Sequence, residues 1–265
     1  MITTKDQLYR TLTLEQTPKR IVSLVPSLTE LIVDLGLESA LVGVTKFCVH
    51  PKQIRKEKVV VGGTKQVHFD KIKNLSPDFI LCNKEENTLD MVRELEHIAL
   101  VHVSDILDLD ETIQVIEQYG QIFNVENRAN LIKNEIKKRS EAFQHFAKQQ
   151  PKLKVAYFIW QKPWMAVGSS TFINAMLELN NFKNVLANKD RYPQIELNDL
   201  KKMKPEVIML SSEPFPFNKK HLEAMSQRFP ESKIVIVDGE YFSWYGSRLI
   251  KAFTYFRELR QHLLD

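Results

Sequence analysis

The chain has 265 residues, and its 43% hydrophobic content suits one large or two modest globular domains. Its formal net charge is +4 with acidic and basic residues interspersed, which argues against a nucleic-acid-binding surface. Two cysteines, Cys48 and Cys82, give no disulfide framework. Residues 1–20 lack the apolar stretch of a secretory signal, and no run is long enough to span a membrane. We therefore expect a cytoplasmic protein from the sequence as written, or a periplasmic or cell-surface protein if the sequence is trimmed.

Strand-like and helical patterns alternate along the first half of the chain. "RIVSLVP" (20–26) predicts a short buried strand. "SLTELIVDLG" (27–36) predicts a helix with Ser27 as N-cap, Glu30 three residues later and Gly36 as terminator. Such alternation is typical of a parallel, doubly wound sheet. The other predicted elements are strands at 41–45, 59–62, 78–83 and 100–104 and helices at 87–97 and 111–123.

One long helix is predicted over 126–149, because this stretch contains no Gly or Pro and many helix formers and ends just before Pro151. The alternating pattern then restarts. We predict an α/β fold with an N-terminal lobe at 1–124, a connecting helix at 125–150 and a C-terminal lobe at 151–265. The elements predicted for the second lobe are strands at 154–160, 206–212 and 233–239 and helices at 171–181, 197–203, 220–229 and from 247.

An internal repeat supports this division. "FDKIKNLSPDFILC" (69–82) and "LNDLKKMKPEVIML" (197–210) align without a gap at an offset of 128. The shared unit is a helix, a Pro-acid turn and a buried strand. A proline after a helix and an acid before a strand are common, so chance explains one such match easily. A match at the corresponding point of both halves is harder to explain by chance.

Aromatic side chains concentrate in the loops that follow the predicted strands, where parallel sheets bind ligands. In "DGEYFSWYGSR" (238–248), we expect Tyr241 and Phe242 to fill the core and Trp244 and Tyr245 to face Trp160 and Trp164. Glu85 and Glu213 correspond at the repeat offset, and either face each other across a cleft or act as first-turn helix acids. The candidate ligand-binding residues are Lys46, Phe47, Lys65, Glu85, Trp160, Trp164, Arg191, Tyr192, Glu213, Phe215, Tyr241, Trp244, Tyr245 and Arg248.

Other chemistries are less well supported by the sequence. Cys48 and His50, with carboxylates, form a candidate transition-metal site because all of them are competent ligands. A cytoplasmic enzyme using the same loops is a further alternative, although Cys48 and His50 make poor nucleophile and base geometry. No Gly-rich phosphate-binding motif is present.

Several motifs together resemble a known family. "RIVSLVPSLTELIVDLGL", "VVVGGTKQVHFDKIKNLSPDFILCN", the long central helix and "KIVIVDGEYFSWYGSR" are similar to the substrate-binding proteins of cobalamin and iron-siderophore ABC importers, the helical-backbone metal receptors. "GVTKFCVHP", "WQKPWMAVGSSTF" and "SSEPFPF" resemble most a cobalamin-binding-like subgroup without a signal peptide. The resemblance covers roughly residues 19–260.

This resemblance implies a class III periplasmic-binding-protein fold, with two Rossmann-like lobes joined by a backbone helix and one ligand held in an aromatic interlobe cleft. It implies a non-enzymatic binding protein with no catalytic cofactor, and we expect the protein to be a monomer. Its ligand would be a corrinoid, ferric siderophore or haem, and its partner an ABC permease. In this family, an acidic residue on each lobe docks onto the permease. The matching residue of the first lobe is Asp70. At the repeat offset Asp70 corresponds to Asn198, so the candidate of the second lobe is the adjacent Asp199.

Overall fold

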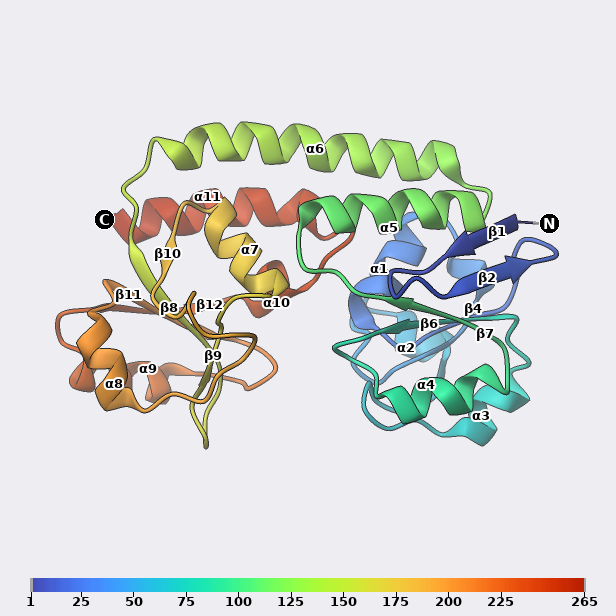
Figure 1. Cartoon of the computed structure of the whole chain (residues 1–265), viewed down its shortest axis with the longest axis horizontal. Helices are drawn as coiled ribbons and strands as arrows, with labels where there is room; N and C mark the ends of the chain where they lie inside the picture. The colour runs from blue at the N-terminus through green and yellow to red at the C-terminus, as the bar shows by residue number, and fades with distance from the viewer. Residues whose placement is uncertain (1, 265) are drawn as a thin grey trace. The chain divides into compact units, whose positions relative to one another are not determined.

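The computed structural model describes residues 2–264, which form two compact units (Figure 1). The first unit comprises the described residues up to Ile136 together with Tyr245–Arg248. The second comprises Lys137–Trp244 together with the described residues from Leu249 onward. The chain therefore leaves the second unit after Trp244, contributes four residues to the first, and returns.

The first unit contains a five-stranded parallel sheet in the order β5-β4-β3-β6-β7. Figure 1 shows α1 and α5 on one face of this sheet and α3 and α4 on the other. Its elements are β1 (Ile2–Lys5), β2 (Thr11–Leu14), β3 (Ile21–Ser23), α1 (Pro26–Asp34), the 3-10 helix η1 (Glu38–Ala40), β4 (Leu41–Val44), α2 (Ile54–Glu57), β5 (Val59–Val60), α3 (Phe69–Asn74), β6 (Phe79–Asn83), α4 (Leu89–Glu96), β7 (Leu100–Ser104) and α5 (Leu109–Ile122).

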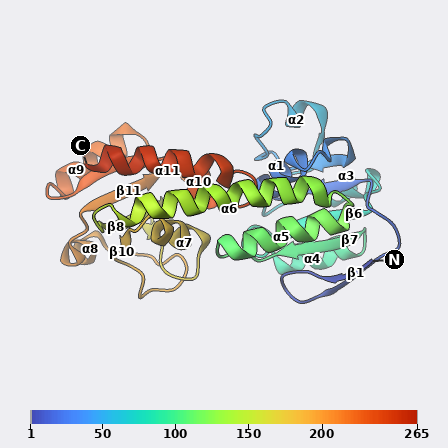
Figure 2. The same cartoon turned by 90° about the horizontal axis from the view of Figure 1, so that it is seen from above.

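The second unit has the same plan, with the parallel order β10-β8-β11-β12 and β9 paired antiparallel to β8. Helix α6 contributes its first residues to the first unit and the rest to the second, where Figures 1 and 2 show it beside α11. The Phe143 ring of α6 lies 5.8 Å from that of Phe256 in α11. The elements are α6 (Glu126–Lys148), β8 (Lys154–Trp160), β9 (Met165–Ala166), α7 (Phe172–Leu179), β10 (Lys183–Asn184), α8 (Leu197–Met203), β11 (Val207–Ser211), α9 (Lys219–Arg228), β12 (Lys233–Val237), α10 (Gly239–Ser243) and α11 (Leu249–Leu264).

The structure confirms the internal repeat and gives its turn a function. In both units a short helix, α3 or α8, leads through a left-handed residue and a proline into the central strand β6 or β11. The acid after the proline then accepts backbone hydrogen bonds at the start of the neighbouring strand. Asp78 accepts from the Arg20 amide at 2.9 Å, and Glu206 accepts from the Lys154 amide at 2.8 Å. The matching acids thus hold the chain where it enters β3 and β8.

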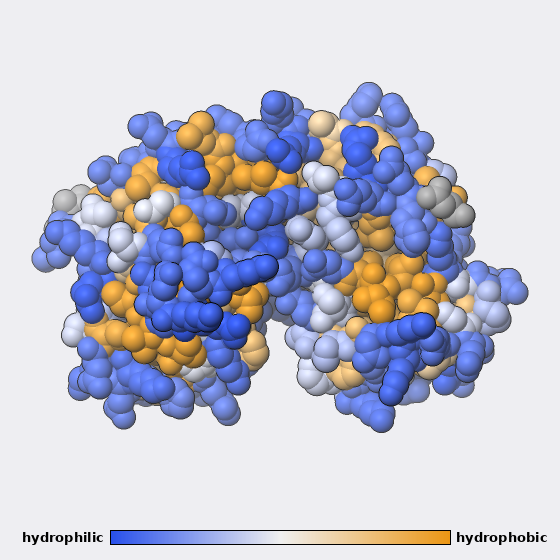
Figure 3. Space-filling view, turned by 180° about the vertical axis from the view of Figure 1, so that it is seen from behind, coloured by the Kyte–Doolittle hydropathy of each residue, from blue (hydrophilic) through white to orange (hydrophobic). Residues whose placement is uncertain are grey.

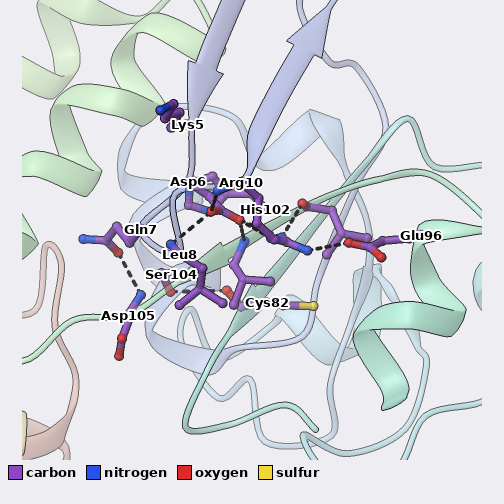
Figure 4. A network of polar contacts seen from close by, with 12 residues as sticks. Lys5, Asp6, Gln7, Leu8, Arg10, Cys82, Glu96, His102, Ser104 and Asp105 are labelled. Carbon is purple, nitrogen blue, oxygen red and sulfur yellow. Dashed lines mark hydrogen bonds and ion pairs between the residues drawn. The ribbon is translucent and has the colours of Figure 1, made fainter. Parts of the chain in front are cut away.

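The N-terminal hairpin of β1 and β2 is not predicted by the sequence patterns, and its turn covers the edge of the first sheet (Figure 4). β7 is the last strand in the sheet order, so the backbone groups on its outer side have no strand partner. Exposed strand edges invite pairing with other chains. Side chains of the turn occupy two of these groups and the amide that follows the strand: Arg10 donates to the Val101 carbonyl at 2.8 Å, Asp6 accepts from the Val103 amide at 3.2 Å, and Gln7 accepts from the Asp105 amide at 3.0 Å.

A buried histidine lies in β7 next to this contact. His102 is fully buried, and its ring nitrogens lie 2.8 Å from the Gln118 side-chain oxygen and 3.2 Å from the Tyr119 hydroxyl. Burial lowers the pKa of His102 to about 4, although the Gln118 hydrogen bond and the Asp6 carboxylate oppose the shift. The imidazole is therefore neutral at neutral pH.

The start of α1 differs from the prediction. Its N-cap is Val25, with Pro26 in the first turn, rather than Ser27, so Glu30 does not complete a capping box. Proline is well suited to the first helical position because the amide it lacks would have no helical partner there. Among the described residues, no helix is long and apolar enough to cross a membrane. The face shown in Figure 3 is mostly hydrophilic, with hydrophobic side chains gathered in patches.

Candidate functional site

The first unit brings four predicted ligand residues together at the carboxyl ends of β4, β5 and β6. Phe47 is 49% exposed, and the Lys46 ammonium lies 5.1 Å from the centre of its ring. Both side chains reach the loop after β5, where a Cβ on Gly63 would lie 3.2 Å from the Phe47 ring. The Lys65 ammonium donates to the carbonyl oxygen of Glu85, which joins this loop to the one after β6. The edge of the sheet therefore presents an aromatic ring with one cation over it and a second cation in the loop after β5.

A second carboxylate at this edge is missing from the sequence-based set. Burial raises the pKa of Glu86, whereas the neighbouring Lys65 lowers it. Burial raises the pKa of the Tyr245 phenol, and the charge of Glu86 raises it further. Glu86 directly follows the predicted Glu85, so the double acid is the only signal by which the sequence could have indicated it.

Arg248 does not have the role that the sequence suggested. Its guanidinium forms two hydrogen bonds with the Glu30 carboxylate of α1, at 2.7 and 3.0 Å, and both residues are about 95% buried within the first unit. We therefore correct its assignment from a ligand contact to a structural ion pair. No sequence pattern indicates this ion pair, because the two residues are 218 positions apart.

The second unit arranges three predicted aromatic residues, together with Phe217, in a continuous row. Trp160, the last residue of β8, is 39% exposed, and the Phe215 ring packs edge-on against it at 5.5 Å. Phe215 contacts Phe217 at 4.7 Å, and Phe217 stacks on Trp164 at 5.9 Å with the rings 8° from parallel. The exposed Trp160 is thus held by a packed aromatic support.

Glu213 and Trp244 form a pair in the same unit. The Glu213 oxygen Oε1 accepts from the Trp244 indole nitrogen at 2.9 Å and from the Ser243 hydroxyl at 2.8 Å. Burial raises the pKa of Glu213, and the charges of Glu240 and Asp238 raise it further, whereas the two hydrogen bonds lower it. Trp244 is only 7% exposed, so its ring is largely enclosed.

The other aromatic residues of 238–248 have separate surroundings. Phe242 is fully buried and packs 5.1 Å from Tyr157 and 4.8 Å from Phe256, which confirms its expected place in the core. Tyr241 is half-buried and stacks on Tyr255 with ring centres 4.7 Å apart. What the sequence suggested to be a loop contains the short helix α10, capped by the Asp238 carboxylate.

Arg191 and Tyr192 lie in a loop with a fixed backbone. The Arg191 amide donates to the Ser169 carbonyl at 2.8 Å, and its own carbonyl accepts from the Gly168 amide at 2.7 Å. Arg191 has a φ of 55°, and both side chains are half-buried. Their contact with a ligand stays a prediction.

The suggested metal site is not assembled. Cys48 is fully buried with its sulfur 3.2 Å from the Thr29 hydroxyl and 3.3 Å from that of Thr45. Burial raises the pKa of its thiol, which disfavours the thiolate that metals bind. Within residues 2–264, no three His, Cys, Asp or Glu side chains are grouped so as to hold a metal ion. Cys48 and His50 are therefore no longer candidates for a metal site.

The two suggested docking acids both lie on short helices with exposed side chains. Asp70 is in the first turn of α3, and Asp199 is in the first turn of α8. Asp199 accepts a hydrogen bond from Lys202 at 2.7 Å, which lowers the pKa of its carboxyl. Their positions in equivalent helices agree with the internal repeat, and their role in docking stays a prediction.

Comparison with known proteins finds relatives along most of the chain. An uncharacterized ABC transporter substrate-binding lipoprotein of Bacillus subtilis is 29% identical over 219 residues, covering 78% of this chain and 68% of the relative. A vitamin B12-binding protein of Photorhabdus laumondii is 24% identical, covering 89% and 85%. The solved periplasmic vitamin B12 binding protein of Vibrio cholerae is 19% identical, with a TM-score of 0.82 over 94% of this chain and 99% of that one.

These relatives correct one expectation and confirm another. The expected cytoplasmic location is wrong, because the matching proteins are described as a lipoprotein and as periplasmic proteins. The α/β architecture with parallel sheets agrees with the fold of the solved structure. Residues 21–232 match the periplasmic binding protein family, and the chain belongs to that family.

Proposed function

We propose that this protein is a non-enzymatic substrate-binding component of an ABC importer, and that its ligand is a corrinoid, haem or ferric siderophore. One observation carries the proposal: in each unit an exposed aromatic ring lies at the carboxyl end of the parallel sheet. These rings are Phe47 in the first unit and Trp160 in the second. Membership of the periplasmic binding protein family supports the general function.

The chemistry of the two edges favours a flat, partly anionic or amide-bearing ligand. Trp160 is 39% exposed, so part of its ring is accessible for stacking on a macrocycle. Lys46 lies over the Phe47 ring, Lys65 lies in the loop after β5, and both are exposed and can donate to carboxylate or amide groups at the periphery of the ligand. The named ligands of the relatives, vitamin B12 and heme, have this character.

A screen of the purified protein tests the ligand class. We expect one of cobalamin, cobinamide, haem or a ferric siderophore to raise the melting temperature, because a ligand that binds only the native state stabilises it. Isothermal titration calorimetry would then give the affinity. If none of the four raises the melting temperature or binds in calorimetry, the proposed ligand class is wrong.

Substitution of Trp160 tests the contact. We expect Trp160→Ala to weaken the ligand about tenfold or more, since truncating an aromatic anchor costs about 2 kcal/mol. Tyr9→Ala is the matched control, because Tyr9 is 82% exposed in the turn of the N-terminal hairpin. Equal affinities for the two variants would contradict the stacking role of Trp160.

A separate uptake assay tests whether the protein docks onto a permease. In cells that carry the cognate importer, we expect Asp70→Lys to reduce ligand uptake while the purified variant binds ligand as before. The exposed position of Asp70 in α3 makes an effect on folding small. Unchanged uptake would exclude Asp70 from docking.

A further inference from the structure

The carboxylate of Glu213 connects two loops at the carboxyl edge of the second sheet. Glu213 lies two residues after the end of β11, and its partners Ser243 and Trp244 follow β12. The Gly239 amide donates to the Ser212 hydroxyl at 2.9 Å, which joins the same loops a second time. These contacts attach helix α10 to the end of β11.

The hydrogen bond between Trp244 and Glu213 limits how the Trp244 ring can contact a ligand. An indole has a single donor, and that of Trp244 points at Glu213 Oε1 at 2.9 Å. The ring can therefore offer a ligand only its carbon edges and faces, in an orientation set by Glu213. A ring that is 93% enclosed and bonded at its nitrogen has little freedom to turn.

The space around Glu213 is tight. A Cβ at position 239 would lie 2.6 Å from Glu213 Cγ and 2.4 Å from the Ser211 hydroxyl. Only glycine leaves room for the Glu213 side chain to pass and reach Trp244. The residue at 239 and the conformation of Glu213 are therefore coupled.

Glu213 also belongs to the loop that supports the exposed aromatic ring. Phe215, two residues later, packs against Trp160. A change in the path of this loop would alter the support of Trp160 as well as the hold on Trp244. We propose that Glu213 is a positioning residue of the ligand site, which orients Trp244 and sets the loop that carries Phe215. This inference rests on the proposed function of the same site.

The first test is the indole signal of Trp244 in the ligand-free protein. The chain has three tryptophans, so a 15N-labelled sample gives three indole N–H resonances, and Trp244→Phe assigns the one of interest. In Glu213→Ala we expect this resonance to shift and its hydrogen exchange to accelerate, while those of Trp160 and Trp164 stay near their positions. In Glu213→Gln the side-chain carbonyl still accepts the bond, so the resonance should remain protected. If Glu213→Ala fails to fold, Glu213→Met is used instead, because the methionine side chain fills the space without accepting the indole hydrogen bond.

The second test is affinity for whichever of cobalamin, cobinamide, haem or ferric siderophore the wild-type protein binds. We expect about a tenfold loss in Glu213→Ala and rescue to within about threefold in Glu213→Gln, the scale of one well-placed hydrogen bond. Ser243→Ala is the control, since it removes the other donor to Oε1 and keeps the Trp244 bond.

The outcomes separate the two proposals. If the wild-type protein binds a ligand and Glu213→Ala binds it equally well, the positioning role is wrong and the proposed function stands. An unmoved Trp244 resonance in Glu213→Ala would also overturn the positioning role. If the wild-type protein binds none of the four compounds, the proposed function fails and the positioning role fails with it.

Discussion

Replacing Arg248 by alanine should destabilise the protein severely. The Arg248 guanidinium and the Glu30 carboxylate are about 95% buried and share two hydrogen bonds of 2.7 and 3.0 Å. Arg248→Ala leaves the carboxylate in the interior without this cation, and breaking a buried pair in this way costs about 3–5 kcal/mol. Since domains are stable by about 5–15 kcal/mol in total, the loss is a large fraction of that stability.

Urea unfolding, followed by circular dichroism, measures the effect as a decrease in the midpoint at an unchanged slope. The double variant Glu30→Leu, Arg248→Met removes both charges and should recover most of the stability, because apolar groups of similar size can replace a buried pair. Lys202→Ala breaks the exposed pair with Asp199 and should leave the midpoint almost unchanged. If Arg248→Ala costs no more than Lys202→Ala, the buried pair does not stabilise the first unit as argued.

Three further predictions follow from described contacts. Because His102 has a folded pKa of about 4, below its ordinary value of 6.5, the unfolded chain binds the extra proton first, and stability should fall as pH decreases from about 6.5 to about 4. His102→Gln should flatten this part of the stability profile in calorimetry, and an unchanged profile would assign the pH dependence to other groups. Asp6→Ala combined with Arg10→Ala should uncover the edge of β7 and produce dimers or larger species in light scattering. A variant at the exposed Thr13 should scatter light as the wild type does. A monomeric double variant would refute the covering role of the hairpin turn. Gly239→Ala should lower the melting temperature by several degrees because its methyl group would overlap Glu213 and Ser211, and an unchanged melting temperature would show that the loop relaxes easily.

The sequence predicted those parts of the fold that depend on local pattern. Strands 100–104 and 154–160 and helix 197–203 occur at the predicted bounds, because apolar alternation and helix-breaking residues delimit them directly. The hairpin at the N-terminus was missed, since its strands are only four residues each and their burial comes from packing on the sheet. Short edge elements carry too little periodicity to be recognised.

For the candidate site, the sequence predicted where aromatic residues gather better than it predicted the roles of single residues. The concentration of aromatic residues after the strands correctly indicated the row from Trp160 to Phe217, since parallel strands place such loops at one edge. The roles of Arg248 and Trp244 depend on partners 218 and 31 residues away, and no pattern in the sequence reveals those pairings. A charged or aromatic residue in a loop therefore has the same appearance whether it binds a ligand or another side chain.

The return of Tyr245–Arg248 to the first unit determines how the protein can be divided. A fragment ending near Ile136 would contain Glu30 and lack its cation, so we expect it to fold poorly even though it carries the entire five-stranded sheet. Adding a peptide that spans 245–248 in trans should be too weak to repair it, because four residues bury little surface. A circular permutant that begins at Tyr245 keeps these residues in the chain, and would show whether the covalent link between Trp244 and Tyr245 is needed for the native state.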